Sequence, residues 1–227
     1  MAVPLIAYTV EHYNSLPELR LAKECIEAKH ASKVLVDELA DTFVQYGVEK
    51  ELGVTLLHNH FLMEPKEMLV NVDSVAVPWN KDSGAEELGD VNASSWRFME
   101  GGLMPYEFTY HGRKVPLDSF HLQRFLEAVR TILDTFGLMD IFGICLLDGK
   151  KIDSSATIEF TSGRANITLP FDSGPYNGVG IDAMWQFYSC HHPTKREQEA
   201  RAGPIAFGQC ENRCKGKPHE SRHIANT

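Results

Sequence analysis

The chain lacks any stretch approaching the ~18 consecutive apolar residues that a membrane-spanning helix needs. Its first ten residues also lack the basic start and the apolar run of a secretory signal peptide. These two absences argue against a membrane partner. They predict a soluble intracellular protein with a cytoplasmic location, and a nuclear location remains open.

Positive charge is scarce. The 227 residues include 22 Lys and Arg against 31 Asp and Glu, which gives a net charge of −9. Binding along nucleic acid requires a concentrated positive surface, because phosphate contacts dominate the affinity. Nucleic acid is therefore not an expected partner. Apolar residues make up 43% of the chain, which is enough for a globular protein with a buried core.

Cysteine is infrequent, and the motifs of the commonest enzyme classes are missing. The five cysteines form an odd number without the spacing of a disulfide framework, so we expect reduced thiols. The chain has no Gly-x-Ser-x-Gly turn, no phosphate-binding loop and no Gly-x-Gly-x-x-Gly after a strand. Serine hydrolases, nucleotide-binding proteins and dinucleotide-binding proteins are thereby disfavoured.

The succession of helical and strand-like segments predicts an α+β fold, in which one long amphipathic helix packs against an antiparallel or mixed sheet. We expect a single domain over residues 1–192 and a basic Cys/His-rich tail over 193–227. Within the domain, the residue patterns predict helix over 15–47, sheet over 53–111, helix over 117–136 and sheet over 140–170.

Some elements are predicted in finer detail. Segments rich in β-branched and aromatic residues predict strands at 54–61 and 68–79, and a short helix is expected at 182–188. The long helix should face the sheet with an apolar stripe formed by Phe125, Val129, Ile132 and Phe136.

The tail concentrates residues that bind zinc. Between positions 190 and 223 lie three of the five cysteines and four of the ten histidines. Thiolate and imidazole are preferred zinc ligands, and close spacing lets a short loop wrap an ion. The pattern predicts a structural zinc site, completed if needed by Cys190 or His192, with the main ligands Cys210, Cys214, His219 and His223.

The same tail is locally basic, with seven Lys or Arg against four Glu between Thr194 and His223. We expect it to serve as an interaction element for a protein partner. A solvated tail that binds neither metal nor protein is the alternative.

A second set of candidate ligands follows Gly53. On a strand, His58 and His60 point to the same face, and Glu64 follows them, so iron, manganese or zinc is an expected ligand. A glycine, His-x-His and a following Glu resemble the first motif of the cupins. This resemblance implies a metal-dependent enzyme, with His111 as the fourth ligand. The second cupin motif is missing, and an ordinary polar strand surface is the alternative.

A third hypothesis concerns the strand-like segment after Gly163. Alternation places Arg164 on its polar face, where a guanidinium would bind a carboxylate or phosphate. With Trp96 as a further contact, the chain would then be a small-molecule binding or processing protein. A solvent-facing strand beside a hairpin is the alternative.

Four segments, which begin at Val54, Met68, Pro78 and Gly163, resemble a loose set of uncharacterised proteins from filamentous fungi. That resemblance implies no activity. The first functional hypothesis is therefore an intracellular protein with a structural zinc site and an interaction role in its tail. A metal-dependent enzyme and a small-molecule protein are the alternatives.

Overall fold

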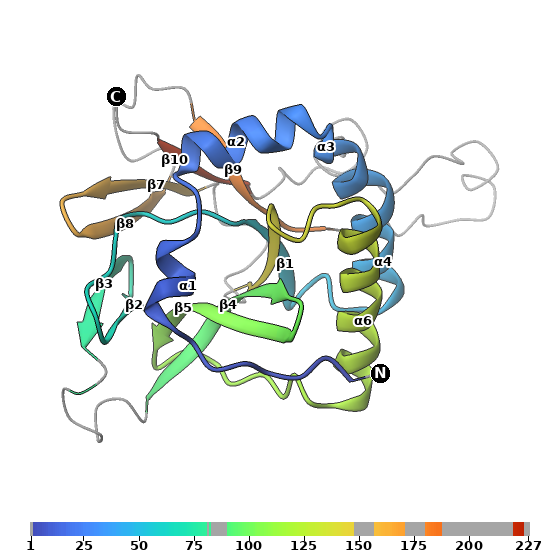
Figure 1. Ribbon diagram of the computed structural model, residues 1–227, viewed down its shortest axis with the longest axis horizontal. Helices are drawn as coiled ribbons and strands as arrows, with labels where there is room; N and C mark the ends of the chain where they lie inside the picture. Colours follow the sequence, from blue (N-terminus) through green and yellow to red (C-terminus); the bar gives the residue numbers. More distant parts are fainter. Residues whose placement is uncertain are drawn as a thin grey trace.

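Ten strands close into a barrel within the part of the chain that the structure describes (Figure 1). The computed structural model describes residues 2–80, 82, 90–147, 157–170, 180–187 and 220–224. The order around the barrel is β1 (Leu52–Leu56), β6 (Phe142–Leu146), β4 (Val91–Met99), β5 (Gly102–Tyr110), β2 (Glu67–Val72), β3 (Val75–Asn80), β8 (Ala165–Pro170), β7 (Thr157–Ser162), β10 (Glu220–Ile224) and β9 (Gly180–Trp185). Pairing of β9 with β1 closes the ring.

The sheet is mixed, and the fold is α+β as predicted. Two strand pairs, β2 with β5 and β7 with β10, are parallel. The remaining pairs are antiparallel. Parallel neighbours need long connections, so the barrel joins segments that lie far apart in the sequence.

Short helical segments precede the barrel: α1 (Val10–Asn14), α2 (Leu19–Ala28), α3 (Ala31–Val34), the π-helical turn η1 (Leu35–Leu39) and α4 (Ala40–Gln45). Most of the segment predicted as helical, 15–47, is therefore helical, but it is divided. His30 takes a left-handed φ of 49° between α2 and α3, which ends α2. The additional helix α1 lies before the predicted segment, and Thr9 caps it by accepting the N–H of His12.

The predicted long helix forms as α6 (Phe120–Thr135), which Ser119 caps. Phe125 and Val129 are buried in an apolar cluster that joins α6 to α4, β1 and β6. The predicted stripe is wrong at its end, because Phe136 lies beyond the last helical residue and is 46% exposed. None of the described helices is long and apolar enough to cross a membrane.

Three predicted elements need correction. The strand expected over 54–61 ends at Leu56. The strand expected over 68–79 is a hairpin of β2 and β3, whose turn contains Asp73 at a φ of 56°. The helix expected over 182–188 is wrong, because residues 180–185 form β9. Short apolar segments fit either element, and here pairing with β1 and β10 selects the strand.

The tail contributes one strand to the barrel. β10 lies parallel to β7 and antiparallel to β9. The remaining tail residues, 193–219 and 225–227, lie outside the described residues. The described part of the tail thus belongs to the same sheet as the predicted domain.

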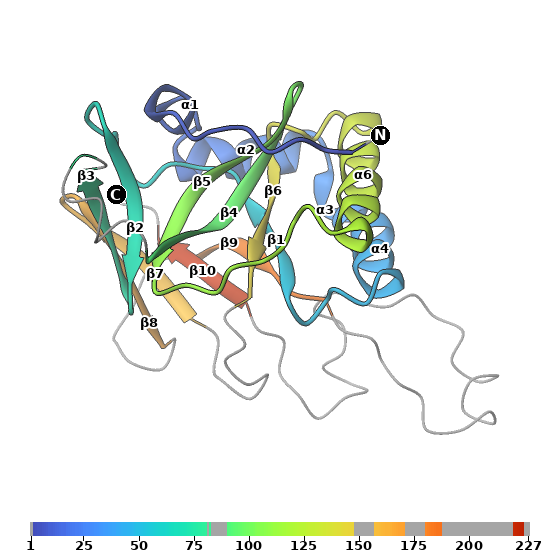
Figure 2. The same cartoon turned by 90° about the horizontal axis from the view of Figure 1, so that it is seen from below.

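Apolar side chains cover one face of the barrel wall at β1. Leu52, Val54 and Leu56 pack toward α4 and α6 on the outside. Residues alternate along a strand, so Thr55 faces the interior. At one end of the barrel α1 closes this interior, and β1 begins and β6 ends at the opposite end (Figure 2). A second apolar cluster, which includes Tyr13 of α1, packs at the end of the barrel that α1 closes.

Candidate functional site

The predicted zinc ligands of the tail fall largely outside the described residues. Cys210, Cys214 and His219 lie there, as do Cys190 and His192. The main chain of the fourth ligand, position 223, is part of β10 and pairs with β7 and β9. The structural zinc site therefore stays a prediction.

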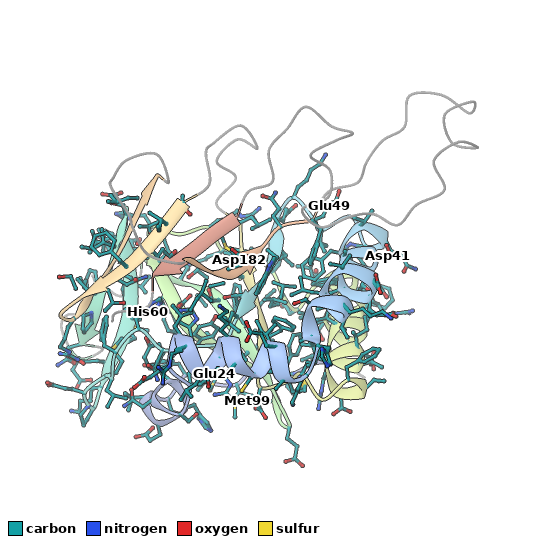
Figure 3. All side chains as sticks on the ribbon, turned by 90° about the horizontal axis from the view of Figure 1, so that it is seen from above. Glu24, Asp41, Glu49, His60, Met99 and Asp182 are labelled. Atoms are coloured by element: carbon teal, nitrogen blue, oxygen red, sulfur yellow. The ribbon has the colours of Figure 1, made fainter. Side chains whose placement is uncertain are left out.

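The structure brings the two predicted histidines together. The rings of His58 and His60 meet edge to face, with their centroids 4.8 Å apart. His58 is buried, and its Nδ1 lies 2.8 Å from the carbonyl oxygen of Leu56. A carbonyl oxygen only accepts hydrogen bonds, so Nδ1 of His58 carries the proton. Figure 3 shows His60 beside the first turn of α2, where Glu18 and Asn59 form a bridge.

The other two ligands of the cupin-like set lie elsewhere. Glu64 is exposed and lies 3.7 Å from Arg164, because the chain leaves β1 after Leu56 and turns outward. His111 is exposed in the turn after β5, with Nδ1 3.6 Å from Asp90. Within the described ranges, no group of three or more His, Cys, Asp or Glu side chains is placed to hold a metal ion. The predicted four-ligand set is thus not assembled.

Arg164 and Trp96 do not form a common pocket. Trp96 is buried in the apolar cluster beneath α6. Arg164 lies in the turn of the β7–β8 hairpin, where its guanidinium donates hydrogen bonds to Glu67. It also lies 5.9 Å from the centre of the Phe61 ring. This arginine is therefore occupied in linking the hairpin to β2.

An acid–base pair that the sequence analysis does not select lies beside the two histidines. Nε2 of His60 is 3.3 Å from Oε1 of Glu107, and the imidazole is almost fully enclosed, with 4% exposure. The hydroxyl of Ser95 donates a 2.7 Å hydrogen bond to Oε2 of Glu107. The Glu107 side chain keeps 23% exposure. Both carboxylate oxygens are thus held, while part of the Glu107 side chain remains exposed.

The elements that position this pair are neighbouring strands. Ser95 of β4 and Glu107 of β5 are register partners, and irregularities in the pairing flank Ser95 on both sides. Such β-bulges re-aim side chains and commonly occur next to active sites. Here the two bulges place the Ser95 hydroxyl against the Glu107 carboxylate.

Two tyrosines complete the cluster. The Tyr13 hydroxyl accepts the main-chain N–H of His60 at 3.3 Å. The Tyr106 hydroxyl donates to Oγ1 of Thr55 at 3.2 Å. Burial, and after it the negative charge of Glu107, raises the pKa of both phenols. Both tyrosines therefore stay protonated at neutral pH as O–H donors.

No family model, curated protein or solved structure matches this chain. The resemblances to cupins and to fungal proteins accordingly stay predictions. The chemistry open to the interior cluster follows from its own geometry. The Glu107 carboxylate, which the Ser95 hydroxyl and the His60 imidazole hold in position, is a group that can accept and return a proton.

The cluster is covered by α1. Arg97 of β4 donates to the carbonyl oxygen of His12 at 3.1 Å and to the Ser15 hydroxyl at 3.3 Å. The side chain of Asn14 makes two hydrogen bonds to the main chain of Met63, at 2.9 and 2.8 Å. These contacts tie α1 to β4 and to the segment that follows β1, and they enclose the interior at this end.

Sequence patterns offer little help in finding this cluster. Glu107 lies 47 residues after His60, and Tyr13 lies 47 residues before it. The one local indication is a carboxylate in a strand between two aromatic residues, Tyr106 and Phe108. An acidic residue at such a position needs a partner if it faces the interior.

Proposed function

We propose that this protein is an enzyme that moves a proton on a small organic molecule, with Glu107 as the acid–base group. The observation that supports the proposal is the position of that carboxylate. Its two oxygens are held by His60 and Ser95, and its side chain is 23% exposed. Charged groups are rarely enclosed without a partner, and a carboxylate that neighbouring side chains hold in position is a common acid–base catalyst.

The chemistry follows from the contacts. Glu107 accepts a proton from a C–H or O–H group of the substrate, and the electron pair stays on the substrate as an enolate or alkoxide. The same oxygen then returns the proton at another atom, so that no other reactant is consumed. The protonated Tyr13, whose hydroxyl accepts the main-chain N–H of His60, can donate its own O–H to the negative charge that develops on the substrate. The imidazole of His60 holds the carboxylate in position throughout.

Hydrogen–deuterium exchange tests this proposal without knowledge of the product. A panel of small carbonyl compounds with acidic C–H groups is incubated with the protein in D2O, and proton NMR follows the loss of C–H signal. We expect enzyme-dependent exchange for at least one compound. Glu107→Gln should slow this exchange by about 10²–10⁴-fold, the usual contribution of a positioned acid–base group.

A matched control exists in the exposed pair of His111 and Asp90, whose atoms lie 3.6 Å apart. Asp90→Asn removes a carboxylate beside an imidazole, as Glu107→Gln does, but outside the interior. Exchange by the control should equal that of the parent protein. Equal exchange by Glu107→Gln and the parent would overturn the proposal.

The earlier hypotheses for the tail are independent of this site. A zinc site of Cys210, Cys214, His219 and His223, a protein partner and a cytoplasmic location stay predictions. Zinc bound there would be structural, because four protein ligands close its coordination shell.

A further inference from the structure

A pocket of about 260 Å³ is lined by residues near the start of β4 and the end of β5. This end of the barrel lies away from α1 (Figure 2). It is separate from the hydrogen bonds that hold Glu107. Its walls combine two cationic side chains, an amide, two hydroxyls and an apolar side, formed by Lys50, Arg113, Asn92, Ser94, Thr109 and Leu147.

The charge of these walls is positive. No Asp or Glu side chain of the described residues lines the pocket, whereas Lys50 and Arg113 both do. Arg113 uses Nη1 to contact Glu51 at 3.0 Å, outside the lining. A guanidinium has five N–H donors, so this contact leaves donors that can face the pocket.

The turn that forms one wall is held in place. Asn92 donates to the carbonyl oxygen of Gly112 at 2.8 Å, and the main chain of His111 donates to Asp90 at 2.8 Å. His111 has a φ of 52°, so the chain reverses sharply here. A Cβ atom on Gly112 would come within 2.9 Å of Cβ of Thr109. The turn therefore requires glycine at this position and is built before any ligand arrives.

We propose that this pocket binds the anionic group of a small molecule, a carboxylate or a phosphate. Arg113 supplies planar N–H donors suited to paired oxygens, and Lys50 adds a point charge. The hydroxyls of Ser94 and Thr109 offer further donors to the same oxygens. The volume is slightly below the ~300 Å³ at which ligand pockets usually begin, which favours a small anion over a nucleotide.

The position of the pocket also narrows the substrate class of the proposed enzyme, and this step rests on that proposed function. Thr109 and Glu107 are two residues apart on β5, so they face the same side about 6.6 Å from each other. Glu107 does not itself line the pocket, so a substrate whose anionic group sits there would have to extend about that far beyond Thr109 to bring a carbon to Glu107. Small organic acids and phosphate monoesters have this size.

Binding measurements on the full chain test the anion site. Isothermal titration uses benzoate, phenyl phosphate and the neutral benzyl alcohol as probes, which share a ring and differ in charge. The two anions should bind, and the alcohol should bind at least ten times more weakly. Lys50→Gln and Arg113→Gln should each raise the dissociation constant of the anions about tenfold or more. Lys114→Gln, the same change one residue outside the lining, should stay within about twofold.

Specific outcomes would overturn the anion site. The first is equal binding of the alcohol and the anions, and the second is a loss of anion binding in Lys114→Gln as large as that in Lys50→Gln. The third is that neither anion binds at a probe concentration of 10 mM, which is above the ~1 mM dissociation constant of a weak ligand. Glu107→Gln separates the two proposals. If it binds benzoate as the parent does while Lys50→Gln does not, the anion site stands whether or not proton exchange is found.

Discussion

Replacing Phe125 with alanine should destabilise the protein more than any comparable change on the same helix. The ring has 0% exposure and contacts Phe43 edge to face, with centroids 4.8 Å apart. It also contacts Tyr46 at 5.9 Å. Fully buried Phe→Ala substitutions cost about 3–5 kcal/mol, since they combine lost transfer free energy with a cavity. Because α6, α4 and β1 share this cluster, little backbone relaxation can fill the space.

Thermal unfolding with a matched control measures this effect. Phe120 begins the same helix and is 80% exposed, so Phe120→Ala should change stability by no more than about 0.5 kcal/mol. For a chain of this size 1 kcal/mol shifts the melting temperature by about 2–4 °C. Phe125→Ala should therefore melt about 6–20 °C below the parent. If both variants melt together, the packing of α6 described above is refuted.

Two further predictions concern charge and metal. Hydrogen bonding from Arg164 lowers the pKa of Glu67 from its ordinary value of 4.5. The ion pair therefore stabilises the folded protein at pH values above 4.5, and this stabilisation is lost as the pH falls through the lowered pKa that Glu67 has in the folded protein. The melting temperature of Arg164→Gln should accordingly fall less between pH 5 and pH 3 than that of the parent, and equal slopes would contradict the pair's role. Elemental analysis should find about one zinc per chain, and a double change of Cys210 and Cys214 to serine should remove it without deleting β10. Cys145→Ser is the control and should keep the zinc; a metal-free parent protein would end the zinc prediction.

Elements with strong local patterns could be predicted closely. The helix expected over 117–136 forms over 120–135, because a capping serine and a 3.6-residue apolar period act within one segment. The sheet expected over 140–170 contains the β7–β8 hairpin, and Gly163 in its turn has a φ of 60°. Such features depend on neighbours in the sequence, so the sequence contains the information needed.

The closure of the barrel could not be predicted in this way. β9 is a strand only because β1 and β10 provide its hydrogen-bond partners. β10 lies in a polar tail, and its partners β7 and β9 lie about 40–60 residues earlier. Pairing over such separations leaves no periodic pattern in either strand, and local propensity is weaker than the tertiary context.

The candidate site divides in the same way. The sequence by itself determined that Phe125 would be buried, because its place in an apolar helical stripe depends on spacings of a few residues. His58 and His60 do lie together, but they lie beyond the end of β1 at Leu56 and not on the predicted strand. Only the tertiary structure decided that Glu107, 47 residues beyond His60, would meet its imidazole, and that Glu64 would turn away. The reason is physical: two bulges in the β4–β5 pair aim Ser95 and Glu107 at one point, and a bulge is a property of strand pairing that one strand alone cannot express.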